Sequence, residues 1–199
     1  STRAESSSDD KRSRSSPVAD VSVAIVLWVI TAYNRLIALK NQVANAWKQI
    51  DVQLKRRHDL IPNLVNTVKG AMDFEKGTLE AVISARNKAV GASGVAQVAK
   101  AEGELTQALG RLFALSENYP ELKATANIGQ LQEELASTEN KVGFARQLYN
   151  DTATQYNTAQ QQFPTNLVAG LAKATPADLW EIEDAAERAV PKVDLSFGK

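Results

Sequence analysis

Apolar residues recur at alternating steps of three and four residues along two long stretches of the chain. Such steps place side chains on one face of an α-helix, whose period is about 3.6 residues. The first stretch covers residues 34–69, and the second covers residues 128–163 and stops before Pro164. Each is predicted to be a long bundle helix with one apolar seam. The first seam is Leu36, Val43, Trp47, Ile50, Leu54, Ile61, Leu64 and Val68, and the second is Ile128, Leu131, Leu135, Thr138, Val142, Ala145, Tyr149, Thr152, Tyr156, Ala159 and Phe163.

Two shorter segments between these stretches also have helical spacing. They cover residues 73–91, which end at a glycine, and residues 94–117, which precede Pro120. Nowhere do apolar and polar residues alternate between hairpin turns, so strands are not expected. Four amphipathic helices joined by short turns predict an all-α protein. Residues 34–173 are predicted to form a four-helix up-and-down antiparallel bundle with two long helices.

An uncharged run, "VSVAIVLWVITAY" at residues 21–33, comes before the bundle. Residues 17–33 are therefore predicted to form a short apolar anchor helix, and we expect membrane contact through Val21–Tyr33. A spanning helix needs about 20 apolar residues, so a signal-peptide core and an exposed helix end stay open as alternatives. Lys and Arg are similarly frequent on both sides of the run and do not set its orientation. We expect a single pass with the bundle on the extracytoplasmic side.

The two ends of the chain are polar. Residues 1–16 are half serine and contain nothing apolar larger than alanine, so they are predicted to be disordered. Residues 174–199 are predicted to form an acidic C-terminal helix and a tail. The helix is expected over residues 176–189, with Thr175 as its N-cap and Pro176 at its first position.

The composition narrows the chemistry that the chain can perform. The formal net charge is 0, and the chain has no cysteine and one histidine. Disulfides, thiolate nucleophiles and cysteine-rich zinc sites are excluded, and so are the paired Glu-x-x-His motifs of di-iron bundles. No phosphate-binding glycine motif is present. We expect no cofactor and no metal, although a cation held by Glu133, Glu134 and Glu139 is an alternative. A neutral chain without interleaved aromatic and basic residues also argues against nucleic-acid binding.

The most unusual short segment is "KRRHD", residues 55–59. Arg57 occupies a seam position, where an unpaired buried guanidinium would be costly. It therefore needs a carboxylate, and the second long helix offers Glu139, with Glu134 as the other candidate. Such a structural ion pair would fix the register of the two long helices. The neighbouring residues are a candidate interaction surface, with a merely solvated face as the alternative: Arg56, His58 and Asp59.

Four segments in a fixed order carry a resemblance to known proteins. They are "YNRLIALKNQVANAWKQIDVQLKRRHDLIPNLVNTVKG", "ALGRLFALSENYPELKA", "QLQEELASTENKVGFARQLYNDTATQYNT" and "FPTNLVAG". Together, over about residues 33–193, they resemble the LemA family of bacterial proteins. The resemblance implies a membrane-anchored, four-helix up-and-down bundle without an established enzymatic activity.

The pattern and the resemblance together favour a membrane-anchored helical-bundle protein that acts as an interaction or scaffold module. The sequence does not identify its protein partner. His58 comes without a recognisable nucleophile or orienting group, so we expect no enzymatic activity. An unrecognised metal-dependent enzyme is the alternative.

Overall fold

The computed structural model describes residues 17–70, 75–123 and 126–181 of the chain. The expected disorder of residues 1–16 lies outside this part, as does the second half of the expected C-terminal helix. Within the described ranges the chain is helical and has no strand, as the apolar spacing predicted.

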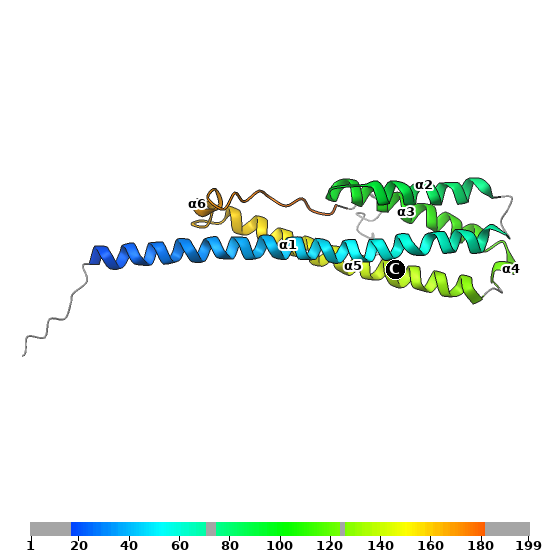
Figure 1. Cartoon of the computed structure of the whole chain (residues 1–199), viewed down its shortest axis with the longest axis horizontal. Coiled ribbons are helices and arrows are strands. Elements are labelled where there is room, and N and C mark those ends of the chain that lie inside the picture. Colours follow the sequence, from blue (N-terminus) through cyan, green and yellow to red (C-terminus); the bar gives the residue numbers. More distant parts are fainter. Residues whose placement is uncertain (1–16, 71–74, 124–125, 182–199) are drawn as a thin grey trace, which may run out of the picture.

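Two long helices form the frame of the bundle. Helix α1 (Pro17–Lys69) has 53 residues and helix α5 (Ala126–Gln161) has 36. They lie side by side and antiparallel, and the N-terminal part of α1 extends beyond the bundle (Figure 1). The prediction of two long antiparallel helices is therefore confirmed.

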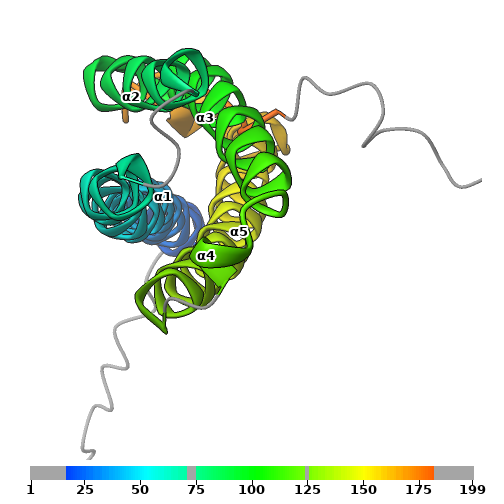
Figure 2. The same ribbon diagram turned by 90° about the vertical axis from the view of Figure 1, so that its right-hand side faces the viewer.

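The shorter helices complete the bundle. Helices α2 (Lys76–Gly91) and α3 (Val95–Ser116) form a hairpin that packs against the half of the frame far from the N-terminus. Viewed along the bundle, α1, α2, α3 and α5 lie around a common core (Figure 2). Two short helices, α4 (Pro120–Lys123) and α6 (Asn166–Ala169), flank α5 at its two ends. The all-α, four-helix bundle is thus the observed architecture.

The anchor helix and the first bundle helix are one continuous element. Helix α1 runs from the start of the apolar segment to the end of the first seam, and Pro62 lies inside it. Between Pro17 and Pro62 the sequence has neither glycine nor proline, so nothing in it ends a helix there. The bundle is consequently joined to the apolar segment without a flexible linker.

The apolar seams meet in three successive clusters along the bundle. The cluster at the far end joins α1, α2, α3 and α5, and the middle cluster joins α1, α3 and α5 with Trp180 from the C-terminal segment. The cluster nearest the N-terminal extension contains Leu36, Ala159 and Ala172. Every seam residue of α5 from Ile128 to Ala159 is at least partly buried, whereas Phe163, the last position of the seam, is exposed.

The C-terminal segment differs from the prediction. Residues 174–181, called the strap below, are extended instead of helical and run from α6 back along the bundle (Figure 1). The backbone of the strap hydrogen-bonds to side chains of α5, and Trp180 is buried. These contacts outweigh the local helix signal, so the expected helix is wrong over residues 176–181.

Candidate functional site

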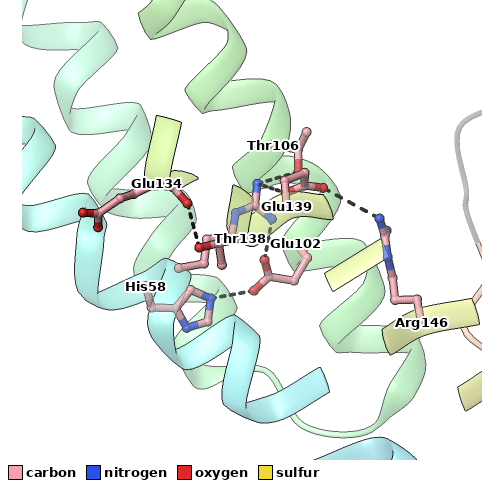
Figure 3. Close-up of polar contacts among 8 residues, drawn as sticks. His58, Glu102, Thr106, Glu134, Thr138, Glu139 and Arg146 are labelled. Atoms are coloured by element: carbon pink, nitrogen blue, oxygen red, sulfur yellow. Dashed lines mark hydrogen bonds and ion pairs between the residues drawn. The ribbon is translucent and has the colours of Figure 1, made fainter. Parts of the chain in front are cut away.

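A cluster of charged side chains lies inside the bundle between α1, α3 and α5 (Figure 3). Arg57 Nη1 lies 3.0 Å from Glu102 Oε2, and Arg57 Nη2 lies 3.0 Å from Glu139 Oε2. Arg57 and Glu102 are each only 3% exposed. Two carboxylates therefore share one buried guanidinium, and they come from two different helices. This group, with His58 and Thr106, is called the charge cluster below.

His58 and Thr106 complete the hydrogen bonding of the charge cluster. His58 Nε2 lies 2.6 Å from Glu102 Oε1, so both oxygens of this carboxylate have a partner. Arg57 Nη2 donates to Thr106 Oγ1 at 2.8 Å. Its contact with Glu139 Oε2 lacks hydrogen-bond geometry, and that buried oxygen receives no hydrogen bond from the described residues. Charge attraction alone thus holds Arg57 to Glu139.

A second arginine lies at the outer edge of the charge cluster. Arg146 Nη2 is 3.7 Å from Glu139 Oε1, and both side chains are partly exposed. Two guanidinium groups and two carboxylates balance each other, which lowers the cost of removing Arg57 and Glu102 from water. Among the described residues, no group of three or more His, Asp or Glu side chains is arranged to hold a metal ion. The arrangement is suited to aligning helices.

The structure places the residues singled out from the sequence in different environments. Arg57 and Glu139 lie together. The Glu134 carboxylate accepts a hydrogen bond from Gln130 Nε2 at 3.5 Å and points away from Glu102 and Glu139 (Figure 3). Glu134 is therefore not a member of the charge cluster.

The expected surface of Arg56, His58 and Asp59 does not form as a unit. Arg56 and Asp59 are exposed, but His58 is 8% exposed and belongs to the charge cluster. The backbone oxygen of His58 also accepts a hydrogen bond from Arg86 Nε of α2 at 2.8 Å. Inclusion of His58 in a surface patch is therefore wrong, because Glu102 and Arg86 hold it inside the bundle.

Two members of the charge cluster were missed from the sequence. Glu102 and Thr106 lie one helical turn apart on α3, each directly after a buried seam residue. A glutamate beside Ala101 in a seam of small residues could have indicated a buried carboxylate. The pairing with Arg57 could not be read from this spacing, because it depends on how α3 packs against α1.

Two asparagines of α5 hold the strap through its backbone. Asn157 Nδ2 donates to Ala177 O at 2.9 Å, and Ala177 N donates to Asn157 Oδ1 at 2.8 Å. Asn150 makes the same pair of bonds with Trp180, at 2.9 and 2.8 Å. Each side-chain amide thus satisfies both backbone groups of one strap residue, as a neighbouring strand would. Asn150 and Asn157 are called the asparagine clasp below.

The spacing of the asparagine clasp matches an extended chain. Seven residues separate the asparagines, which corresponds to about 10.5 Å along a helix. Three residues separate Ala177 from Trp180, which corresponds to about 10 Å in an extended segment. A sequence signal for the clasp exists, because the dipeptide Tyr-Asn occurs twice at this spacing, at residues 149–150 and 156–157.

Side chains of the bundle also enclose the strap tryptophan. Trp180 packs against Trp47 of α1 with ring centroids 6.0 Å apart, and the Arg146 guanidinium carbon lies 5.6 Å from the centroid of the Trp180 ring. Tyr149 Oη donates to Asp178 O at 2.7 Å. Burial, and secondarily the Asp178 carboxylate, raise the pKa of Tyr149 above its usual 10.0. Arg146 therefore connects the charge cluster with the strap.

A cavity of about 370 Å³ lies beside the strap. It is bordered by α1, by α5, by the turn between α2 and α3, and by strap residues 175–177. Tyr156 contributes to its wall, and the buried Tyr156 hydroxyl has no hydrogen-bond partner among the described residues. The groove that holds the strap therefore has unfilled space and an unused polar group next to it.

Comparison with known proteins identifies the family of this chain. The model of the LemA family matches residues 46–195. Protein LemA of Metamycoplasma hominis is 26% identical over 164 residues, which cover 81% of this chain and 72% of that protein. Magnetosome protein MamQ 2 of Paramagnetospirillum magneticum is 22% identical over 191 residues, which cover 83% of this chain and 70% of that protein. The family match covers most of the chain, including α5 and the strap, and the chain belongs to the LemA family.

Proposed function

We propose that this protein is a membrane-tethered interaction module whose bundle binds an extended peptide segment of a partner protein. One observation carries the proposal: the asparagine clasp pairs with both backbone groups of two residues in an extended chain. Side-chain amides that hydrogen-bond to backbone groups give affinity for an extended segment, while adjacent pockets select the side chains of that segment. In this structure the strap of the same chain occupies the groove.

The exposed apolar surface of α1 supports the tether. Helix α1 is long and apolar enough to cross a membrane, and only 11% of its most apolar 18-residue window is buried. A core helix would be mostly buried, so water is an unfavourable environment for this segment. We place one pass of the chain here, with the bundle on the extracytoplasmic side. The exposed large residues are Val18, Val21, Val23, Ile25, Val26, Leu27, Trp28, Ile30 and Tyr33.

The unfilled space beside the strap supports exchange with a partner segment. The cavity next to strap residues 175–177 could accept a larger side chain than the strap provides. The strap is covalently attached, which gives it a high effective concentration in the groove. A partner segment must therefore make better contacts than the strap does. The cavity beside the clasp provides them.

The charge cluster serves this function as a rigid support for the groove. Arg57 ties α1 to α3 and to α5, and Glu139 in turn contacts Arg146, whose guanidinium covers Trp180. The walls of the groove come from the same helices. Fixing their alignment fixes the distance between Trp47 and the clasp, which a bound segment must match.

The test uses the full chain in detergent micelles and a labelled peptide with the strap sequence, residues 174–181. Trp180→Ala weakens the binding of the chain's own strap to the groove. We expect this variant to bind the peptide at least ten times more tightly than the wild-type chain does. Adding Asn150→Ala and Asn157→Ala should abolish that binding. Asn140→Ala, an exposed asparagine of the same helix, is the matched control and should leave it intact.

Two results would contradict the proposal. A Trp180→Ala chain that does not bind the peptide would show that the strap is a structural part of the bundle. Equal binding with and without the asparagine clasp would show that the backbone of the segment is not recognised. Labelling of intact cells tests the orientation: a Phe144→Cys variant that resists a membrane-impermeant maleimide would place the bundle on the cytoplasmic side.

A further inference from the structure

The end of the bundle nearest the N-terminal extension exposes three large apolar side chains. Phe163 is 80% exposed, Leu167 is 66% exposed and Leu171 is 71% exposed. Leu167 belongs to α6, and Phe163 and Leu171 lie in the hydrogen-bonded turns on either side of it. Val168 and Ala172 of the same segment face inward and are buried. The three exposed residues are called the apex patch below.

The apex patch lies at the level where the apolar segment of α1 enters the bundle. Leu36 of α1 and Ala159 of α5 share one apolar cluster. In an antiparallel pair, each step forward on α5 corresponds to a step back on α1, so Gln161, the last residue of α5, lies at about the level of Asn34. Ala32 is buried, whereas residues 17–28 of α1 are all exposed. Helix α6, which carries Leu167, thus lies beside α1 near the C-terminal end of the apolar run 21–33 (Figure 1).

The charge around this end of the molecule has a single sign. Residues 21–50 contain three basic side chains and no acidic one, and residues 152–177 contain Lys173 and no acidic one. The first acidic residues beyond these ranges are Asp51, Asp151 and Asp178, further into the bundle, and Asp20, on the other side of the apolar run. Lys173 and Arg35 are exposed. A basic rim around apolar side chains complements a membrane surface that contains anionic phospholipids.

We propose that the apex patch is a second membrane contact, which inserts into the headgroup region of the bilayer that α1 crosses. The inference rests on the tether proposed above. Apolar side chains of peripheral elements enter the boundary between headgroups and acyl chains by about 5–10 Å. Trp28 and Tyr33 would lie in the same interfacial layer, where such side chains are enriched. Two contacts with the bilayer fix the tilt of a rigid bundle against the membrane. The α1 helix alone would leave that tilt free to vary.

The absence of cysteine makes the depth of single positions measurable. Leu167→Cys, Val26→Cys and Phe144→Cys are each spin-labelled in the full chain and reconstituted into vesicles of mixed zwitterionic and anionic phospholipid. Phe144 is the matched control, because it is 73% exposed and lies about 25 Å before the end of α5. We expect the ratio of oxygen to water-soluble nickel-chelate accessibility to be several-fold higher at residue 167 than at residue 144, and highest at residue 26.

The labels separate this inference from the tether. Equal, water-like ratios at residues 167 and 144 would overturn the second contact, and a lipid-like ratio at residue 26 would then leave the tether intact. A water-like ratio at residue 26 would overturn the tether and, with it, the second contact.

Charge reversal tests the basic rim. Lys173→Glu should reduce the oxygen-to-chelate ratio of the Leu167→Cys label in anionic vesicles. Lys141→Glu, an exposed lysine in the middle of α5, should not change it. Equal ratios for the two variants would contradict the assignment of an anionic surface.

Discussion

Arg57 of α1 and Glu102 of α3 form an ion pair of 3.0 Å, with side chains that are each only 4% exposed. Removing two charges from water is costly, so such a pair is weak evidence for stability by itself. Its consequence is specificity: any shift of α3 along α1 would separate the charges and leave each buried alone. The pair therefore restricts the bundle to one alignment of its helices.

Replacement of Arg57 by alanine tests this role. The variant leaves Glu102 buried without its cation, and we expect a loss of about 3–5 kcal/mol in the free energy of unfolding. Arg56→Ala is the neighbouring control. Its side chain is exposed, so its effect should stay within about 0.5 kcal/mol. Chemical denaturation of the full chain in detergent, followed by circular dichroism, measures both. Equal midpoints for the two variants would contradict a structural role of Arg57.

The glutamates of α3 offer a second matched pair. Glu102→Gln removes the charge from a buried carboxylate that contacts both Arg57 and His58, and we expect a loss of roughly 1–3 kcal/mol. Glu104→Gln removes the partner of Lys88 from an exposed ion pair, which should cost no more than about 1 kcal/mol. The same denaturation assay compares the variants. A loss for Glu102→Gln that is no larger than the loss for Glu104→Gln would contradict a structural role of the buried carboxylate.

The strap is expected to weaken in alkaline solution. The raised pKa of Tyr149 means that the folded state keeps its phenol protonated after the unfolded state has begun to ionise near pH 10.0. Stability from this group is complete below about pH 10 and decreases as the pH rises towards the folded pKa. Denaturation between about pH 8 and pH 11 should show a steeper loss for wild type than for Tyr149→Phe. Burial also raises the pKa values of Tyr119 and Tyr156, but it does so in both proteins, so a difference between the two curves belongs to Tyr149. Parallel curves would therefore contradict this account.

The purified full chain should contain no stoichiometric metal. The charge cluster uses its carboxylates for Arg57 and His58, and the described residues present no other arrangement of metal ligands. Metal analysis by mass spectrometry, with and without prior treatment by a chelator, provides the measurement. One tightly bound metal ion per chain would instead support the alternative of a metal-dependent enzyme.

Arg57 shows what the spacing of apolar residues can predict and what it cannot. Its place in a seam predicted that it is buried and needs a carboxylate, and the structure places Glu139 beside it. The spacing did not predict Glu102, which makes the more deeply buried pair. A seam position specifies the face of a helix, but not which residue of a third helix lies opposite.

By itself the sequence determined the helices, their approximate ends and the exposed apolar segment. These depend on the period of apolar positions and on glycine and proline, which act within a few residues. The tertiary structure alone decided the partners of Arg57 and His58, and it decided that the strap is extended. Residues 174–181 carry a helix signal that is weak because it is short. The asparagine clasp and the pocket around Trp180 override it, because backbone hydrogen bonds and a buried indole contribute more than a few turns of isolated helix.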